Sequence, residues 1–293
     1  MISVIITTKD RVEFLNRAVR SVMNSSTLPL DVIIVNDGGV KIRDDTFRFN
    51  NDVKIKIINN EISLGGNKAR NQGAEKAEGE YLFFLDDDDA YTVDSISSRL
   101  PYFDDPNTGL VYTGKKFVKS DRLEKVYHVS KPHHEGMLLK HLFKLGNIIG
   151  TTSCVAVRRE AFNDAGGFDT ELHALQDYDL WIRVASQYQV RHDNACNVLY
   201  TVHVNSKQIS SNYYKYLEAG DFLHHKYKVQ LKGFKLEREF LAARYLRVAM
   251  VAAKSSSLAR VKYSLLSFIY KPSLKSLFLL IPVTVSKKIR NFH

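Results

Sequence analysis

Short apolar runs alternate with segments of helical periodicity through the first half of the chain. The apolar runs predict strands over residues 2–7, 31–37, 53–58 and 81–85, and the periodic segments predict helices over residues 12–23 and 64–77. Strands that alternate with helices usually form a parallel sheet with helices packed on its faces. The pattern therefore predicts an α/β fold.

The second half is less regular. A helix is predicted over residues 94–102, an amphipathic helix over 177–187, and strands over 109–112, 125–129, 152–157 and 197–204. From about residue 213 onward, helical patterns dominate. These elements predict a mixed sheet flanked by helices, followed by a helical C-terminal extension.

The composition is that of an ordinary globular protein, with 293 residues, 44% hydrophobic and 25% charged. The net charge of +10 is uneven, because residues 226–293 hold 15 Lys and Arg against 2 Asp and Glu. The excess therefore belongs to the C-terminal extension, while the rest is nearly neutral. A basic extension could bind nucleic acid, but no nucleic-acid-binding motif is present, so we expect no nucleic-acid partner.

Cys154 and Cys196 are too few and too far apart for a disulfide framework, which is typical of a reducing compartment. Residues 2–6 are too short an apolar run for a signal peptide, and the late apolar run at 277–285 is interrupted by Pro282. A bilayer-spanning helix needs roughly 20 apolar residues. We therefore expect a cytoplasmic protein without membrane spans.

The strand predicted over residues 81–85 runs directly into four aspartates, Asp86 to Asp89. Neighbouring carboxylates repel, so at least one pKa should rise unless positive charge is supplied, and a divalent metal ion would supply it. The run therefore predicts a metal site, with a solvated acidic turn as the alternative. An EF-hand fits poorly, because Tyr91 and Ser97 stand where its glycine and glutamate belong.

Two other polar positions follow predicted strands, Thr7 after the first and Asp37 after the second. Ligands of open α/β sheets bind beyond the carboxyl ends of the strands, where Thr7, Asp37 and the aspartate run should converge. Asp37 could accept hydrogen bonds from a nucleotide, or it could simply form a turn with the glycines that follow it. Gly65 and Gly66 precede a predicted helix and could place backbone amides against a diphosphate.

Six short motifs occur in a characteristic order. They are Ser3-Val-Ile-Ile-Thr-Thr-Lys-Asp-Arg11, Asn36-Asp-Gly38, Gly65-Gly-Asn-Lys-Ala-Arg-Asn-Gln-Gly73, Phe84-Leu-Asp-Asp-Asp-Asp89, Gly166-Gly-Phe-Asp169 and Gln176-Asp-Tyr-Asp-Leu-Trp181. Together they resemble the family 2 glycosyltransferases over roughly residues 1–205. The resemblance implies a GT-A domain over residues 1–225, with a donor half at 1–110 and an acceptor half at 111–225.

The resemblance also implies a chemistry: transfer from a nucleotide-diphosphate sugar, with inversion at the anomeric carbon and Mn²⁺ or Mg²⁺ at a D-x-D motif. Thr7 and Asp37 match positions that hold the base and ribose. Asp86 and Asp88 match the D-x-D pair, Asp88 being our choice for direct metal contact, with Asp87 near the ribose. In the same family, Asp177 matches the base that accepts the acceptor's proton.

Several neighbouring residues have two interpretations. Asp177 could be a helix N-cap as well as the base, and Asp179 should complement the helix dipole. Trp181 could stack on an acceptor sugar or lie in the core. His203 resembles a family position near the diphosphate or metal, and could instead be structural. Arg70 could bind a phosphate or pair with an acidic neighbour.

Three departures from the family pattern limit what the resemblance implies. Asn36 and Gln176 replace residues that are often acidic, and Lys9 occupies a position that is frequently aromatic, which leaves the nucleotide open. The Q-x-x-R-W motif of processive synthases is absent, so we expect one sugar to be transferred per event. A nucleotidyltransferase remains the competing enzymatic interpretation.

The basic extension carries apolar residues at helical spacing between lysines and arginines. This pattern predicts a peripheral contact with an anionic membrane surface, on the inner face of the cytoplasmic membrane, or else helices that pack on the catalytic domain. A glycan or lipid-linked acceptor, as in the synthesis of O-antigen, capsule or lipooligosaccharide, would suit such a contact.

Overall fold

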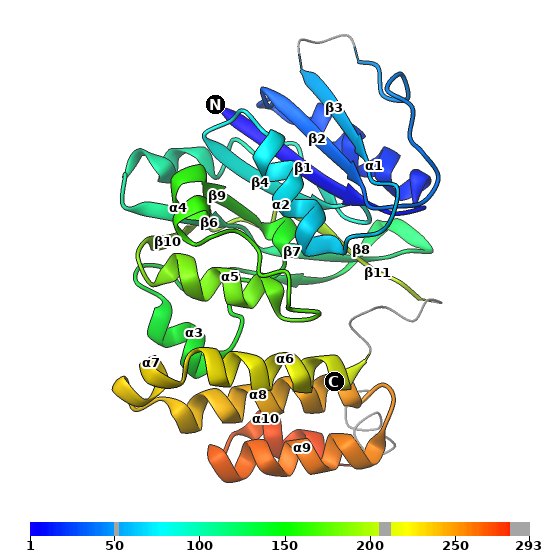
Figure 1. The fold of residues 1–293 in the computed structure, drawn as a ribbon. Helices are drawn as coiled ribbons and strands as arrows, with labels where there is room; N and C mark the ends of the chain where they lie inside the picture. The colour runs from blue at the N-terminus through cyan, green and yellow to red at the C-terminus, as the bar shows by residue number, and fades with distance from the viewer. Residues whose placement is uncertain (50–52, 205–211, 282–293) are drawn as a thin grey trace. The chain divides into compact units, whose positions relative to one another are not determined.

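The computed structural model describes residues 1–49, 53–204 and 212–281 (Figure 1). Contacts divide the chain into two compact units. The first contains Met1–Leu138, Ile149–Glu171 and Gln176–Val204, and the second contains Leu139–Ile148, Leu172–Leu175 and Asn205–His293. The contacts change between Val204 and Asn205, and the domain boundary predicted at residues 225 and 226 stays a prediction.

The first unit is built on a seven-stranded sheet in the order β10-β6-β9-β4-β1-β2-β3. Its strands are β1 (Ile2–Thr8), β2 (Asp31–Asn36), β3 (Lys54–Asn59), β4 (Tyr81–Asp86), β6 (Thr108–Tyr112), β9 (Val155–Arg158) and β10 (Gln189–His192). The strands β3, β2, β1 and β4 are parallel neighbours, and β9 pairs antiparallel with both β4 and β6. The predicted mixed sheet is confirmed.

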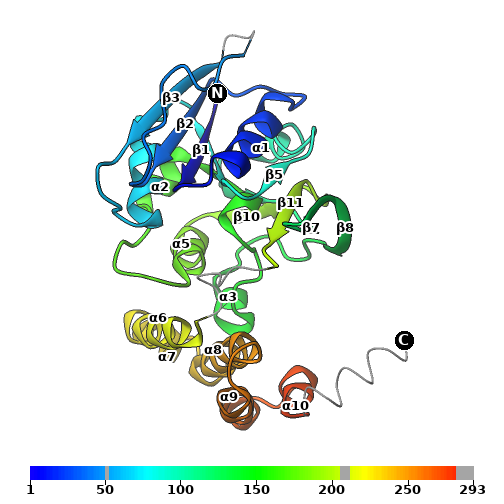
Figure 2. The same cartoon turned by 90° about the vertical axis from the view of Figure 1, so that its right-hand side faces the viewer.

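Helices α1 (Val12–Met23) and α2 (Gly66–Lys76) lie on opposite faces of the β1–β3 part of the sheet (Figure 2). The central strands are buried on both faces, which explains their continuous apolar sequences. Gly73 lets α2 approach β1 closely, because a Cβ there would lie 2.5 Å from Cγ2 of Ile5. The carboxyl ends of the parallel strands are therefore fixed by a tightly packed core.

A second sheet of four strands has the order β5-β11-β7-β8. Its strands are β5 (Ala90–Tyr91), β7 (Lys115–Lys119), β8 (Arg122–Ser130) and β11 (Val198–Val202). The unit also contains helices α4 (Arg159–Asp164) and α5 (Gln176–Ala185) and the 3-10 helices η1 (Leu100–Asp104) and η2 (Thr152–Cys154). The short strands β5, β7 and β10 were not predicted.

Two predicted elements are wrong. Residues 94–99 form turns, and η1 follows them in place of the helix expected over residues 94–102. Serines that bond to nearby backbone disfavour a helix here, as Ser97 Oγ does to the carbonyl of Asp94, and Pro101 restricts Leu100. The strand expected over residues 152–157 begins only at Val155, because η2 occupies its first three positions.

The second unit is helical, which confirms the helical character of the extension (Figure 1). Its helices are α3 (Leu139–Leu145), α6 (Tyr213–Lys226), α7 (Lys228–Gly233), α8 (Glu237–Ala252), α9 (Ser257–Tyr270) and α10 (Leu274–Leu280). The Phe143 ring packs against Tyr227, Phe234 and Phe240 at centroid distances of 5.5, 6.3 and 6.1 Å. These aromatic contacts join α3 to the later helices.

Part of the apolar run at residues 277–285 and all of 282–293 lie outside the described residues. Within the described ranges, none of the helices combines the length and apolarity required to cross a bilayer.

Candidate active site

Thr8, at the end of β1, joins the polar positions that follow the neighbouring strands. Its carbonyl accepts a hydrogen bond from the backbone N–H of Asp37 at 2.8 Å, and its hydroxyl donates to Asp87 Oδ2 at 2.6 Å. Thr7 is in register with Asp86 on β4. The predicted convergence of Thr7, Asp37 and the aspartate run at one edge of the sheet is therefore confirmed.

Arginine side chains supply much of the positive charge at the aspartate run. Arg11 Nε donates to Asp87 Oδ2 at 3.1 Å, and Arg11 Nη1 donates to Asp88 Oδ2 at 2.8 Å. Arg70 Nη2 lies 2.6 Å from Asp86 Oδ1. Of the two interpretations of Arg70, the structure therefore shows the ion pair with an acidic neighbour. Arg11 was not predicted as a site residue, although it stands in the first motif, close behind Thr7.

His203 follows β11 and lies beside Asp88, with Nε2 at 2.9 Å from Asp88 Oδ2. The edge of its ring packs against Phe14 at a centroid distance of 5.1 Å. Arg17 donates to the Asp88 carbonyl at 3.0 Å and to Thr201 Oγ1 at 3.1 Å. Like Arg11, Arg17 was not predicted as a site residue. The second sheet thus contributes residues to the same edge as the first.

The fit of a metal ion depends on Asp88 and His203. The part of the chain that the structure describes contains no group of three or more His, Cys, Asp or Glu side chains arranged to hold a metal. The 2.9 Å between Asp88 Oδ2 and His203 Nε2 is nevertheless close to the roughly 3 Å between adjacent ligands of an octahedral ion with bonds of about 2.1 Å. A carboxylate oxygen and an imidazole nitrogen are both ligand types that hold divalent ions, and these two would supply two of the ligands.

Burial strongly affects two of the four carboxyl groups. Burial raises the pKa of Asp87 to about 6, although Arg11 and the Thr8 hydroxyl oppose the shift. Burial also raises the pKa of Asp89 well above its usual value, with smaller contributions from Asp88 and Asp86. The expected pKa rise is therefore confirmed, but desolvation contributes more to it than mutual repulsion does.

Asp89 serves the framework of the site. Its carboxylate accepts hydrogen bonds from Ser153 Oγ at 2.6 Å and from the Thr201 N–H at 2.8 Å, and the side chain is buried. These bonds tie the end of β4 to η2 and β11.

Asp37 anchors the loop that precedes α2. Its carboxylate accepts from Leu64 N at 2.7 Å, Gly65 N at 2.9 Å, Ser63 Oγ at 2.9 Å and Asn60 Nδ2 at 3.3 Å. Burial tends to raise its pKa, but these four hydrogen bonds outweigh burial and lower it. The carboxylate thus shapes the glycine-containing loop, and contact with a nucleotide stays a prediction.

We expect Asp37→Ala to release this loop. The amides of Leu64 and Gly65 would lose their acceptor, and amide hydrogen exchange at both should become about 10-fold faster or more, since each lost bond is worth about 1–3 kcal/mol. Asp10→Ala is the matched control, because Asp10 Oδ1 accepts from the Val40 amide at 2.9 Å. The control should accelerate exchange at Val40 and leave Leu64 and Gly65 protected; unchanged exchange at both amides in Asp37→Ala would contradict the anchoring role.

Asp177 lies in the first turn of α5, one residue inside the helix instead of at its N-cap position, and its Oδ1 accepts a hydrogen bond from the Tyr178 N–H at 2.7 Å. Trp181 stands one turn further on and therefore on the same face. Its ring is fully buried and its Nε1–H donates to the Gly150 carbonyl at 3.0 Å, which excludes stacking on an acceptor. The segment it packs on also holds Thr152, whose hydroxyl donates to Asp86 at 3.2 Å. The Trp181 hydrogen bond therefore joins α5 to the segment that carries Thr152.

Asp179 lies on the inner side of α5. It is fully buried and pairs with Arg183 at 2.7 Å, and Arg183 donates to the carbonyls of Ala165 and Gly167. The carboxylate therefore acts through a buried ion pair that holds the glycine turn, beyond the expected effect on the helix dipole.

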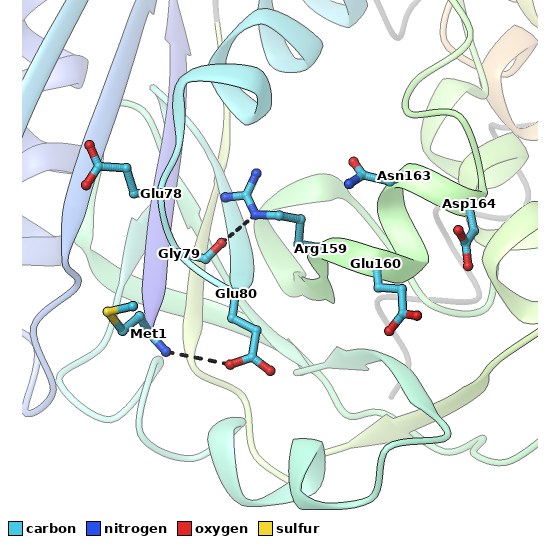
Figure 3. Close-up of a pocket in the computed structure, with 8 residues that line it drawn as sticks. All are labelled: Met1, Glu78, Gly79, Glu80, Arg159, Glu160, Asn163 and Asp164. Atoms are coloured by element: carbon cyan, nitrogen blue, oxygen red, sulfur yellow. Dashed lines mark hydrogen bonds and ion pairs between the residues drawn. The ribbon is translucent and has the colours of Figure 1, made fainter.

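A separate cavity of about 510 Å³ lies at the amino ends of β1 and β4 (Figure 3). It is lined by Met1, Glu78, Gly79, Glu80, Arg159, Glu160, Asn163 and Asp164. Because β1 and β4 are parallel, this cavity lies at the edge of the sheet opposite to the aspartate run. Arg159 Nε donates to the Gly79 carbonyl at 2.7 Å, so this guanidinium group stabilises the backbone that lines the cavity.

The comparison with protein families settles the class. Residues 3–166 match the model of "Glycosyl transferase family 2". The chain is a family 2 glycosyltransferase. An uncharacterized glycosyltransferase of Haemophilus influenzae is 23% identical to it over 99% of this chain and 97% of that protein. The glycosyltransferase is also 24% identical to WfaP of Escherichia coli, a UDP-Glc:alpha-D-GlcNAc-diphosphoundecaprenol beta-1,3-glucosyltransferase, over 74% of this chain and 82% of WfaP.

Solved structures of the same fold support the GT-A architecture of the glycosyltransferase. TarS 1–349 of S. aureus, in complex with UDP-GlcNAc, matches with a TM-score of 0.58 and 17% identity over 100% of this chain and 92% of that one. The mannosyltransferase PcManGT of Pyrobaculum calidifontis, in complex with GDP-Man and Mn²⁺, matches with a TM-score of 0.58 and 16% identity over 99% and 86%. The predicted family and fold are confirmed, and the nucleotidyltransferase interpretation is set aside.

Proposed function

We propose that the protein transfers one sugar from a nucleotide-diphosphate sugar to a glycan or lipid-linked acceptor, with inversion at the anomeric carbon, in the synthesis of a bacterial surface polysaccharide. The observation that carries this proposal is the charged edge at the ends of β1, β2, β4 and β11. There each carboxylate lies 2.6–3.1 Å from a nitrogen of a basic side chain: Asp86 from Arg70, Asp87 from Arg11, and Asp88 from Arg11 and His203. Such an edge suits a ligand that brings both negative charge and hydroxyl groups.

On the donor side, the family match assigns Thr7, Asp37 and Asp87 to the nucleoside, and Asp88 with His203 would hold the metal. Mn²⁺ or Mg²⁺, when bound, neutralises the charge that develops on the departing diphosphate. Arg11 and Arg70 lie at the same edge and supply positive charge from the protein. Asp86 takes part through Arg70 and Thr152, which orient its carboxylate.

On the acceptor side, Asp177 takes the proton from the attacking hydroxyl. The hydroxyl oxygen forms a bond to the anomeric carbon as the bond to the diphosphate oxygen breaks, so one displacement inverts the configuration. No covalent intermediate on the enzyme is needed. Asp177 is half-buried, whereas Asp179 and Trp181 are fully buried, so Asp177 is the more accessible of the two carboxyl groups in this turn of α5.

The relatives support the proposed acceptor class. WfaP, by its name, acts on a sugar linked to diphosphoundecaprenol, a lipid carrier. A relative at 24% identity does not carry its donor or linkage over to this chain. The proposal for the chain is therefore limited to a lipid-linked or glycan acceptor.

The test is a panel of UDP- and GDP-sugars incubated with the full-length enzyme, Mn²⁺ or Mg²⁺ and short lipid-linked acceptors. We expect release of a nucleoside diphosphate with one donor and a product of inverted anomeric configuration, read by NMR. Release of pyrophosphate, or a product of retained configuration, would refute the proposed chemistry.

A further inference from the structure

Helix α9 buries mainly polar and small side chains and exposes mainly apolar ones. Its buried positions are Ala259, Arg260, Tyr263, Ser264 and Ser267. Its exposed positions are Ser257, Leu258, Val261, Lys262, Leu265 and Ile269. The apolar ones recur at helical spacing, with Leu258 exposed by 82%, Leu265 by 47% and Ile269 by 58%. A helix that buries serines and exposes leucines contradicts the usual arrangement in water.

Three buried polar side chains of α9 donate hydrogen bonds to carbonyls inside the unit. Ser267 Oγ donates to the Ala242 carbonyl at 2.9 Å, Arg260 Nη1 donates to the Ile281 carbonyl at 3.0 Å, and Ser264 Oγ donates to the Ser276 carbonyl. Since each of these bonds fixes the rotation of α9 against α8 and α10, the exposed apolar face is a consequence of specific contacts.

Helix α10 repeats the arrangement. Ser276 is buried, and Leu274, Leu277 and Phe278 are exposed. The two helices follow each other through a short connection, and their exposed apolar residues are Leu258, Val261, Leu265, Ile269, Leu274, Leu277 and Phe278. We call these seven residues the apolar face. Exposed apolar side chains on two helices that pack against each other are typical of an interaction site.

The charged residues of α9, of α10 and of the connection between them are all basic. Lys254, Lys262 and Lys275 are exposed, and Lys271 is partly exposed. No Asp or Glu occurs anywhere between residue 240 and the end of the sequence. Apolar side chains flanked by lysines alone match a surface that has hydrocarbon under a layer of negative charge.

A second copy of the chain fits this face less well. A symmetric dimer would place the same patch of both subunits together, so that lysines would meet lysines with no carboxylate from residues 240–281 to pair with them. An anionic bilayer pairs with every lysine and accepts the apolar residues at once. The charge pattern therefore favours lipid over self-association.

We propose that the apolar face of α9 and α10 binds the surface of an anionic lipid bilayer, with its leucines, Ile269 and Phe278 in the interface and its lysines at the headgroups. This assigns residues to the membrane contact and uses no feature of the donor chemistry. It rests on the proposed function only in that a lipid-linked acceptor would be met at the same surface.

The test is flotation of the full-length protein with vesicles of phosphatidylcholine, with and without phosphatidylglycerol. We expect recovery only with phosphatidylglycerol, falling as salt rises. Leu265→Asp/Ile269→Asp should weaken vesicle binding about 100-fold, because two buried apolar side chains are lost and two negative charges are added. The matched control is Val126→Asp/Val129→Asp on β8, whose side chains are exposed by 40% and 44%, and it should bind as the wild type does.

A second pair of variants tests the charges without touching the apolar residues. Lys262→Glu/Lys275→Glu should weaken binding about 10-fold or more, while Lys125→Glu/Lys131→Glu, exposed lysines of the first unit, should leave it unchanged. Donor binding should be equal in all variants, so a failure here is separable from a failure of the proposed transfer.

Equal vesicle binding by test and control variants would overturn the proposal. So would a dimer in analytical ultracentrifugation that Leu265→Asp/Ile269→Asp dissociates while the wild type ignores vesicles, because the apolar face would then be a contact between copies.

Discussion

Asp177→Asn should reduce sugar transfer at least about 100-fold while leaving nucleotide-sugar binding unchanged. The reason is that general-base catalysis typically contributes 10²–10⁴-fold, and an amide cannot accept the proton of the acceptor hydroxyl. The side chain lies in the first turn of α5, outside the aspartate run, so its loss should spare the donor contacts. The measurement is the steady-state transfer rate together with donor affinity by calorimetry.

Asp179→Asn is the matched comparison on the same helix. Asp179 is buried against Arg183, and losing half of that ion pair should destabilise the fold by about 3 kcal/mol or more. Its expected signature is a lower melting temperature, whereas Asp177→Asn should melt as the wild type does. Wild-type transfer rates in Asp177→Asn would show that another group takes the proton.

The core of the first unit could be predicted from sequence because its strands are apolar in nearly every position. The helix over Val12–Met23 was predicted to the residue, and β1, β2, β3 and β4 were within one residue at each end. The short strands β5, β7 and β10 were missed. They have two, five and four residues and are defined by pairing with distant partners, which local pattern does not encode.

The charge balance of the site could not be predicted from single motifs. The aspartates were recognised as a site that demands positive charge, which was assigned to a metal ion, and Arg70 was the one arginine considered as a partner for an acidic residue. Arg11 and Arg17 come from the start of the chain and from α1, more than 70 residues away from the aspartates they contact. Only the parallel register of β1 with β4 brings them together.

For the C-terminal extension, the sequence predicted the helices but not which of their faces is exposed. Helical spacing in the extension was visible in the sequence, yet the pattern could not show which face of each helix is inward. In α9 the serines are inward and the leucines outward, and only the bonds of Ser264 and Ser267 reveal it. The spacing of polar and apolar residues in a sequence defines the two faces of a helix. Which of the two faces is buried depends on the neighbouring elements.

The largest effect on donor binding is expected from Asp88. Its carboxylate lies between Arg11 and His203, at 2.8 and 2.9 Å, so it couples the charged edge to the proposed metal ligand. In Asp88→Asn the side chain keeps its size but loses its charge, which should abolish the metal-dependent part of nucleotide-sugar affinity. We expect at least about a 100-fold loss of affinity in saturating Mn²⁺, because the ion's electrostatic contribution is several kcal/mol.

The measurement is donor affinity as a function of Mn²⁺ concentration, by calorimetry, so it does not depend on turnover. Wild-type affinity should rise with Mn²⁺ and that of Asp88→Asn should stay flat. Asp10→Asn serves as the control, because Asp10 is exposed, close to Arg11 in sequence and bonded to the Val40 amide away from the aspartate run. A rise with Mn²⁺ in Asp88→Asn equal to that of Asp10→Asn would place the ion on other residues. A flat response in the wild type as well would mean that Arg11 and Arg70 neutralise the diphosphate without a metal ion.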